Sequence, residues 1–414
     1  MKGATERLLP GGEGTVRAQD AVYLVPNTVP GDVIYFIAGQ KRRGSRRGQL
    51  AEIIHASSCR GGPRCSVAAS CGGCALQYLK PAHHAEIKNR WIDDAFRKFM
   101  EADTTCQWIG HVEADHRRRR VRWHIGMDES GLFLGFRARS SHDVIRQKHC
   151  PVLSDALQTI HDTLETVLNP SIEAVLATQL SDGIHVVLET RGKNTLRFDP
   201  PCSHAGGLDV QWWQQSVPVI RPLSRPVKDL HEVLPAGEEM IRIRIGPDDF
   251  VQGQYEANHA LVRQVTAWSS GARRIVDLFS GVGNLSLPLA HALKAEVSGA
   301  EIRETSVRRA NANARALHVH ASYMQADLFG DFDTAPFAGA DVLILDPPRK
   351  GARCVCKAMP RLLPAKIIMI SCDVGAGARD AAMLHAHGYR LRALRALDMF
   401  PWAGHVETMT LWTQ

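Results

Sequence analysis

The sequence contains no long hydrophobic run. None of its apolar stretches approaches the roughly 20 residues that a membrane-spanning helix needs, and residues 1–14 contain no apolar core of signal-peptide length. Internal repeats and low-complexity tracts are also absent. With 44% hydrophobic and 22% charged residues, the composition excludes disorder, collagen and coiled coil as the main architecture. We therefore expect a globular protein of the cytoplasm, and 414 residues allow about two to four domains.

An excess of positive charge is missing from most of the chain. Residues 1–150 carry 24 Lys and Arg against 15 Asp and Glu, whereas residues 151–414 carry 26 against 28. A basic segment joined to a nearly neutral one favours a module that binds a polyanion beside a module with another task. An ordinary solvated surface is the alternative, but the local asymmetry favours nucleic-acid binding.

The first 56 residues contain short β-rich runs, at 21–25, 32–37 and 50–54, separated by Pro-Gly and Gly-rich turns. The loop at 41–48 carries five positive charges. Five or so strands with a basic loop predict an OB-like barrel that follows a phosphate backbone. For the loop alone, a solvated hairpin tip is an equally good interpretation.

Residues 57–240 form the expected central domain. A cysteine-rich segment at 57–76 is followed by a helical stretch at 77–100, and from 108 onward short strands and loops alternate with a helix near 154–168. Four prolines between 218 and 235 mark a boundary close to residue 240. We therefore expect three domains, at 1–56, 57–240 and 241–414.

The last domain has the pattern of an α/β fold. Strands are predicted at 274–279 and 295–300, each followed by a helix, and the apolar runs 341–345 and 367–370 are typical of strands buried on both faces. This order predicts a parallel sheet with right-handed crossovers, in the Rossmann manner. The predicted fold class is thus multidomain α/β, with an N-terminal OB-like barrel and a β-rich central domain.

Polar and glycine residues follow the predicted strands of this domain. Gly281 and Gly283 allow a tight turn after the first strand, and Glu301 ends the second strand, where a carboxylate accepts both hydroxyls of a ribose. The full G-x-G-x-x-G spacing of dinucleotide sites is missing, which favours S-adenosylmethionine over NAD. Asp346 opens an Asp-Pro-Pro-Arg segment after the third strand, and amino-group methyltransferases carry a similar segment.

A thiol and a carboxylate narrow the chemistry. Cys372 follows the strand at 367–370, and Glu407 lies in a Gly/Pro-containing loop between two strand-like runs. Carbon 5 of uracil becomes nucleophilic when a thiolate adds at carbon 6, and a base must afterwards remove the carbon 5 proton. Methylation of an exocyclic amine needs neither group, so the pair favours methylation of carbon over methylation of an amine. For Cys372 alone, inert packing beside a buried strand is the alternative, and the nearby motifs favour a catalytic role.

These motifs resemble, in order and over nearly the whole chain, those of the RNA uracil-5 methyltransferase family, in its iron–sulfur branch that methylates ribosomal RNA. The resemblance implies that residues 1–56 form a TRAM domain, that Cys372 is the nucleophile and that Glu407 is the base. It also implies a set of S-adenosylmethionine contacts: Gln252, Phe279, Asn284, Glu301, Asp327 and Asp346. Two segments depart from the family pattern, Gly253-Gln254 after the glutamine and Asp373-Val374 after the nucleophile.

Four of the ten cysteines lie between residues 59 and 74. Their spacing alone predicts structural zinc as readily as an iron–sulfur site. The resemblance implies a [4Fe–4S] cluster, with zinc as the alternative, and leaves Cys59 as a bystander. The implied ligands are Cys65, Cys71, Cys74 and Cys150.

The implied partner is RNA, most specifically 23S ribosomal RNA. Basic and aromatic residues at 116–124 and 133–139 are suited to phosphates and unstacked bases. The target uridine is expected in a loop or flipped out of its stem, because carbon 5 is unreachable inside it. We expect a monomer. The alternatives are a transfer-RNA uridine-5 methyltransferase, an amino-group methyltransferase of nucleic acid, and a non-catalytic RNA-binding or redox-sensing protein.

Overall fold

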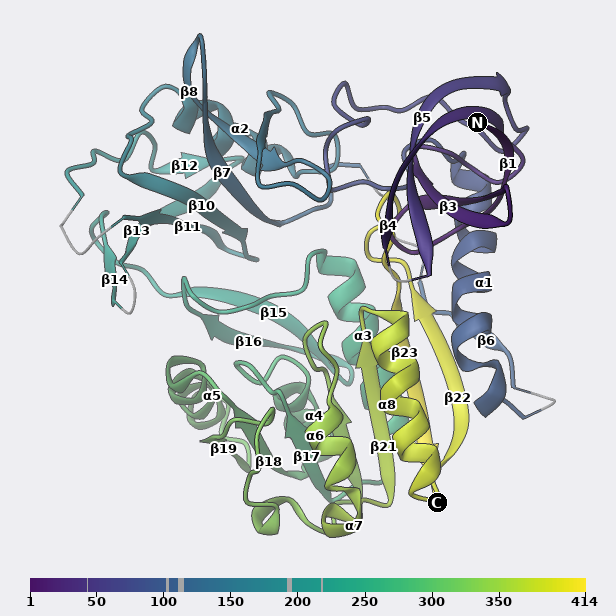
Figure 1. The fold of residues 1–414 in the computed structure, drawn as a ribbon. Coiled ribbons are helices and arrows are strands. Elements are labelled where there is room, and N and C mark those ends of the chain that lie inside the picture. The colour runs from purple at the N-terminus through teal and green to yellow at the C-terminus, as the bar shows by residue number, and fades with distance from the viewer. Residues whose placement is uncertain (43, 102–103, 111–114, 192–195, 217–218) are drawn as a thin grey trace.

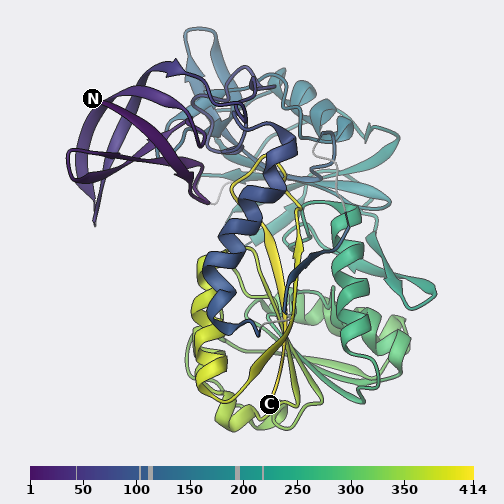
Figure 2. The same cartoon turned by 90° about the vertical axis from the view of Figure 1, so that its right-hand side faces the viewer.

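The computed structural model describes residues 1–42, 44–101, 104–110, 115–191, 196–216 and 219–414. Figure 1 shows three parts: an N-terminal barrel, a central sheet and a C-terminal α/β layer that runs from green to yellow. The barrel and the central sheet both lie at one end of the α/β layer (Figures 1 and 2). No helix in the described part of the chain is long and apolar enough to cross a membrane.

The N-terminal barrel has the five strands expected from the sequence. Its closed order is β1-β2-β3-β5-β4, and a small core that includes Tyr23 and Phe36 fills it. The basic stretch lies on the hairpin of the last two strands, with Arg43 outside the described residues. The strands are β1 (Lys2–Leu8), β2 (Glu13–Ala18), β3 (Ala21–Pro26), β4 (Val33–Arg42) and β5 (Ser45–His55).

The central sheet has the order β12-β13-β11-β10-β7-β8-β9, with β14 paired to β13. Helix α2 (Asp155–Glu165) covers it, and the Ser154 hydroxyl caps that helix by accepting the Leu157 N–H at 3.3 Å. The strands are β7 (Arg120–Asp128), β8 (Gly131–Arg137), β9 (Val144–Arg146), β10 (Ile172–Gln179), β11 (Gly183–Thr190), β12 (His204–Ala205), β13 (Leu208–Ser216) and β14 (Val219–Pro222).

The α/β layer is an eight-stranded sheet of order β19-β18-β17-β20-β21-β23-β22-β6. The first five strands are parallel, as the sequence predicted, and β23 is antiparallel to both neighbours. The strands are β17 (Arg274–Leu278), β18 (Glu296–Glu301), β19 (Ala321–Gln325), β20 (Val342–Leu345), β21 (Lys366–Ser371), β22 (Arg390–Leu397) and β23 (Glu407–Thr413).

Helices flank this sheet, and the two-stranded hairpin β15 (Leu230–Ala236) and β16 (Glu239–Ile245) packs beside α3 and α4. The helices are α3 (Tyr255–Trp268), α4 (Ser286–Leu293), α5 (Glu304–Ala316), α6 (Arg353–Lys357), α7 (Met359–Leu362) and α8 (Val374–Ala386). Short 3-10 turns occupy Pro81–His83, Arg97–Phe99 and Ala335–Phe337.

One segment of the expected central domain belongs physically to the α/β layer. Helix α1 (His84–Phe96) packs on α8, and β6 (Cys106–Trp108) adds to β22 at the sheet edge. Figure 2 shows α1 lying alongside the yellow α8. The apolar face of α1, with Ile92 and Phe96, is buried in the same core as the sheet. This burial fixes residues 84–96 to the α/β layer, although the barrel precedes them in the sequence and the strands of the central sheet follow β6.

Candidate functional site

A tight turn follows β17 at the carboxyl edge of the sheet. Gly281 and Gly283 have φ values of +55° and +85°, and Phe279, with φ of +72°, also adopts the left-handed region. The Phe279 backbone N–H donates to the Ala300 carbonyl at 3.0 Å, which ties the turn to β18. A side chain at Gly283 would clash with its neighbours, because a Cβ there would lie 2.7 Å from Leu287. The turn therefore leaves bare backbone facing a ligand.

Glu301 faces this turn from the end of β18. Its carboxylate accepts the Gly281 N–H at 3.2 Å and the Arg303 N–H at 3.0 Å. Asp327 lies beyond β19 and accepts the Phe329 N–H at 2.9 Å within its own loop. The structure thus places Glu301 directly at the turn, while Asp327 stabilises the next loop along the sheet edge.

Gln252 and Asp346 meet although they are far apart in the sequence. The Gln252 side-chain amide donates to Asp346 Oδ2 at 3.2 Å. Asn284 forms a reciprocal amide pair with Asn258, at 2.9 and 3.0 Å, and the sequence carried no signal for Asn258. The predicted residues Phe279, Glu301, Asp327 and Asp346 thus lie at or just beyond the ends of β17, β18, β19 and β20. Gln252 reaches this edge through Asp346, and Asn284 lies in the turn after β17.

Two carboxyl groups are buried at this edge of the sheet. Asp277 Oδ2 accepts a hydrogen bond from the Ser286 hydroxyl at 2.5 Å, and the other oxygen of Asp277 has no partner in the described part of the chain. Burial raises the pKa of Asp277 to about 7, and burial also raises the pKa of Asp346 to about 7. A ligand with a positive charge and several donors, such as S-adenosylmethionine, fits these acceptors.

The predicted thiol and carboxylate come together through the antiparallel strand. Cys372 directly follows β21, and Glu407 is the first residue of β23. Because these strands are antiparallel and Ser371 pairs with Thr408, the end of one strand lies beside the start of the other. Both groups therefore occupy the same edge of the sheet as Asp346.

Electrostatics couple these groups. Burial, together with the nearby carboxyls of Glu407 and Asp346, raises the pKa of the Cys372 thiol to about 12. Burial, with a contribution from Asp346, raises the pKa of Glu407 to about 8. The positive charge of Arg349 lowers the pKa of both Cys372 and Glu407 and so opposes the effect of burial.

Arg349 and His405 were not among the predicted site residues. The Arg349 guanidinium donates to His405 Nε2 at 3.0 Å, so this nitrogen is the acceptor of a neutral ring. Burial, aided by Arg349 and Lys88, lowers the pKa of His405 to about 4. The signal for Arg349 was present in the sequence, as the last residue of the Asp-Pro-Pro-Arg segment.

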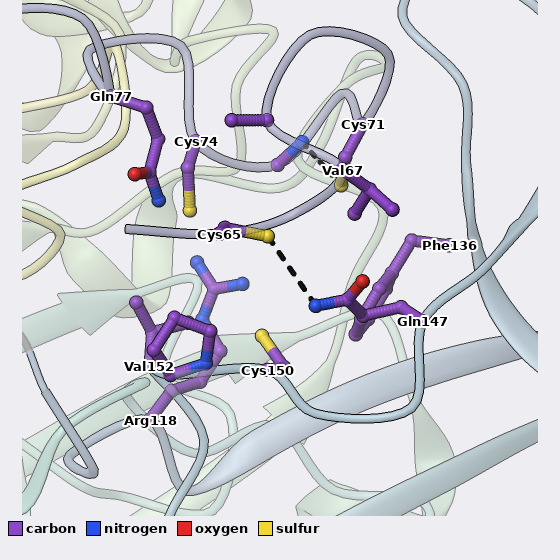
Figure 3. Close-up of a pocket in the computed structure, with 13 residues that line it drawn as sticks. Cys65, Val67, Cys71, Cys74, Gln77, Arg118, Phe136, Gln147, Cys150 and Val152 are labelled. Atoms are coloured by element: carbon purple, nitrogen blue, oxygen red, sulfur yellow. Dashed lines mark hydrogen bonds between the residues drawn. The ribbon is translucent and has the colours of Figure 1, made fainter. Parts of the chain in front are cut away.

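The four predicted ligand cysteines line one pocket (Figure 3). Cys65, Cys71 and Cys74 come from the loop before α1, and Cys150 comes from the loop before α2. Two thiols accept N–H donors at 3.4 Å: that of Cys65 from the Gln147 amide and that of Cys71 from the Gly73 backbone. As they stand, the described residues contain no group of three or more His, Cys, Asp or Glu positioned to hold one metal ion.

Cys59 lies outside this set. Its thiol contacts the Ser57 hydroxyl at 3.0 Å and donates to the Pro30 carbonyl at 3.1 Å. Cys59 is therefore a packing residue where the barrel meets the cysteine-rich segment at 57–76, which is called the cysteine loop below.

The four arginines at 117–120 have different surroundings. Arg119 is buried in an ion pair with Glu232, at 2.7 Å, and donates to the Gln252 carbonyl at 2.9 Å. The guanidinium groups of Arg118 and Arg120 lie over the rings of Phe400 and Phe250, respectively. Because the Arg119 side chain is only 5% exposed, it is not available to RNA, whereas the Arg117 side chain is exposed.

The departure at Gly253 has a structural reason. A Cβ on Gly253 would lie 2.4 Å from the Phe400 ring, so the position must be glycine where that ring packs. The other departure also has a function, because the Asp373 carboxylate caps α8 by accepting the Ala376 N–H at 2.7 Å.

Comparisons with known proteins agree with this geometry. Residues 253–365 match the family described as Methyltransferase small domain. A protein of Pseudomonas aeruginosa named 23S rRNA (uracil(1939)-C(5))-methyltransferase RlmD is 32% identical, covering 98% of this chain and 92% of that protein. A protein of the same name from Shewanella frigidimarina is also 32% identical, covering 97% and 92%.

The structure is similar to that of a Pyrococcus abyssi tRNA (uracil-54, C5)-methyltransferase in complex with S-adenosyl-L-homocysteine. The TM-score is 0.76 over 100% of both chains, at 22% sequence identity, so this likeness concerns the fold. The fold, the matched domain and the near-full-length relatives define an S-adenosylmethionine-dependent methyltransferase. More narrowly, the near-full-length relatives show that the chain belongs to the RNA uracil-5 methyltransferase family, in the group named for 23S rRNA.

Proposed function

We propose that this protein transfers a methyl group from S-adenosylmethionine to carbon 5 of one uridine in 23S ribosomal RNA. The observation that carries the proposal is the adjacency of Cys372 and Glu407 at the β21–β23 edge, beside the crevice that contains Asp346. The relatives that span nearly the whole chain support ribosomal RNA as the substrate.

The reaction begins at the thiol. The Cys372 proton leaves to solvent, the sulfur bonds to carbon 6 of the uracil, and the ring electron pair moves onto oxygen 4 as an enolate. S-Adenosylmethionine supplies an electrophilic methyl group, which carbon 5 takes while S-adenosylhomocysteine departs. Arg349 lowers the pKa of Cys372 and so favours the thiolate that must form.

Glu407 completes the cycle. Its carboxylate removes the proton from carbon 5, the carbon 5–carbon 6 double bond forms again, and the thiolate is expelled. Because the pKa of Cys372 is about 12 and that of Glu407 is about 8, the proton passes from Glu407 back to the sulfur. One proton is released for each methyl group transferred.

The cysteine pocket is proposed to hold a [4Fe–4S] cluster. Four thiols from two separate loops, with N–H donors aimed at two of them, are a suitable donor set. The cluster would bind the cysteine loop to the central sheet through Cys150.

Colour and metal content test the cluster. Anaerobically purified protein should be brown, with broad absorption near ~400 nm, and Cys71→Ser should remove the colour. Cys59→Ser is the matched control, because Cys59 contacts Ser57 and Pro30 instead of the pocket. A colourless protein with one equivalent of zinc would overturn the iron–sulfur assignment.

The barrel and the basic surface are proposed to bind the RNA, with the target uridine flipped out. Carbon 6 must reach the thiol of Cys372, which is half-buried at the sheet edge, and a stacked base cannot approach it. A single chain contains all the proposed reacting groups, so we propose that a monomer suffices.

Nucleoside mass spectrometry and position mapping test the function. Ribosomal RNA from cells lacking the protein should lose one 5-methyluridine, which purified wild-type protein restores and Cys372→Ala does not. Cys106→Ala is the matched control, since burial also raises the pKa of that thiol to about 12 but Cys106 lies on β6 at the far edge strand. Loss of 5-methyluridine from transfer RNA instead would assign the other substrate.

A further inference from the structure

The loop at residues 398–406, here called the base loop, joins β22 to β23 and leads directly into Glu407. Its backbone is turns and irregular structure, so regular hydrogen bonding does not fix its course. Its position depends on what packs against it. Gly253 and Arg118 contact the Phe400 ring, and Arg349 contacts His405. The other contacts described below come from the first hundred residues of the chain.

Lys88 is the most deeply placed of these groups. It lies on α1, its side chain is 0% exposed, and its ammonium is 2.6 Å from the Asp398 carboxylate. The same nitrogen donates to the carbonyls of Phe400 at 3.1 Å and Pro401 at 3.3 Å. All three ammonium protons therefore have acceptors, and all three acceptors are on the base loop.

Other contacts hold the following residues of the loop. The Leu76 N–H donates to the Trp402 carbonyl at 2.9 Å, and the His84 ring packs edge-on against the Trp402 ring at 5.0 Å. Gly404 lies so close to Pro10 that a Cβ would be 1.5 Å from its carbonyl oxygen. The cysteine loop, α1 and the barrel thus each touch the base loop.

The charge of Lys88 also reaches the end of the loop. It is one of the cations that lower the pKa of His405, two residues before Glu407. Lys88 is nevertheless separate from the reacting groups, because its three hydrogen bonds all go to residues 398–401.

We propose that Lys88 is a positioning residue for the base: its buried ammonium holds the base loop so that the Glu407 carboxylate reaches the carbon 5 proton. The inference rests on the proposed function, since it takes Glu407 as the base. A shift of about 1 Å in a reacting group can lower a rate by about 100-fold. The cofactor crevice, which is built from β17, β18 and β20, has no share in these contacts.

The test compares Lys88→Met with Arg90→Met. Both variants remove a cation from α1, but Arg90 forms an exposed pair with Glu86 on the same helix. For Lys88→Met we expect resolution of the covalent adduct to slow by roughly 10–100-fold, so the adduct accumulates on a denaturing gel with natural RNA. Trapping by 5-fluorouridine RNA and the KM for S-adenosylmethionine should stay within about twofold of wild type. Arg90→Met should match wild type, and Lys88→Arg should recover part of the rate.

A second variant guards against general misfolding. Asp398→Asn keeps the volume of the side chain at 398 and leaves both carbonyl contacts of Lys88 in place. This variant should therefore also slow resolution selectively, but by a smaller factor than Lys88→Met does. Equal losses of trapping and resolution in both variants, or resolution at the wild-type rate in both, would overturn the role of Lys88. Wild-type protein that leaves uridine unmethylated in the same assay would overturn the proposed function itself, so the two failures are distinguishable.

Discussion

The two sides of the proposed active site are built in different ways. On the cofactor side, the neighbouring parallel strands β17, β18 and β20 end at the glycine turn, Glu301 and Asp346, respectively. On the base side, Glu407 enters from an antiparallel strand whose preceding loop is held by Lys88, Leu76 and Pro10. On this proposal, cofactor binding depends mainly on the ends of the parallel strands, whereas placement of the base also depends on residues near the N-terminus of the chain.

The strongest test of this contrast is Glu407→Gln. The amide cannot accept the carbon 5 proton, so the methylated RNA–protein adduct should form and persist, with resolution slowed by at least about 100-fold. Denaturing gels and calorimetry measure the adduct and the affinity for S-adenosylmethionine, which should stay near wild type. Product release at the normal rate would show that another group is the base.

The buried ion pair behind the cofactor side gives the next largest effect. Glu232→Gln leaves the Arg119 charge buried without its partner, and the Glu232 side chain is 0% exposed, so the free energy of unfolding should fall by about 3–5 kcal/mol. Chemical denaturation measures this loss. Glu256→Gln breaks the exposed pair with Arg117 and should cost less than about 1 kcal/mol. Equal effects would contradict the difference in burial.

Glu301→Ala should affect the cofactor side alone. Losing a charged hydrogen-bond acceptor for the ribose costs about 1.5–3 kcal/mol of binding free energy, which calorimetry with S-adenosylmethionine would record. Once the cofactor is saturating, the adduct should be resolved at the wild-type rate. Unchanged affinity would remove Glu301 from the cofactor site.

The smallest expected effect is on the pH profile. The base must be ionised, and burial raises the pKa of Glu407 to about 8 from its ordinary value of 4.5. The rate at which the methylated adduct is resolved in a single turnover should therefore rise between pH 6 and pH 8, by up to about tenfold per pH unit, and then begin to level. Affinity for S-adenosylmethionine, measured over the same range, separates this effect from the titration of Asp346. A profile that falls over this range would contradict Glu407 as the base.

The cofactor side could be predicted from the sequence better than the base side could. The strands at 274–278 and 342–345 and the residues at their ends were predictable, because apolar runs and glycine turns are local signals. The meeting of Cys372 and Glu407 depends on β23 inserting antiparallel beside β21, which no local pattern specifies. The resemblance to the family implied roles for both residues, but it gave no physical reason why they lie close together.

Other features were hidden for a different reason. Arg117 and Arg119 are both arginines in one basic run, and only the fold shows that Arg119 is buried against Glu232 while Arg117 pairs at the surface with Glu256. Lys88 belongs to no motif, and its acceptors lie more than 300 residues away. A charged residue in an amphipathic helix is ordinarily solvated, so its burial could not be deduced from α1 alone.

The pairing of β6 with β22 also protects the protein against aggregation. Without residues 84–108, the β22 edge would present unpaired backbone N–H and C=O groups, and the apolar surface that α1 covers on α8 would be exposed. Such an edge is a template for strands of other molecules. A fragment that begins at residue 241 would contain every proposed reacting group and the proposed cofactor site, yet it would be prone to aggregate. A soluble catalytic fragment must therefore include α1 and β6.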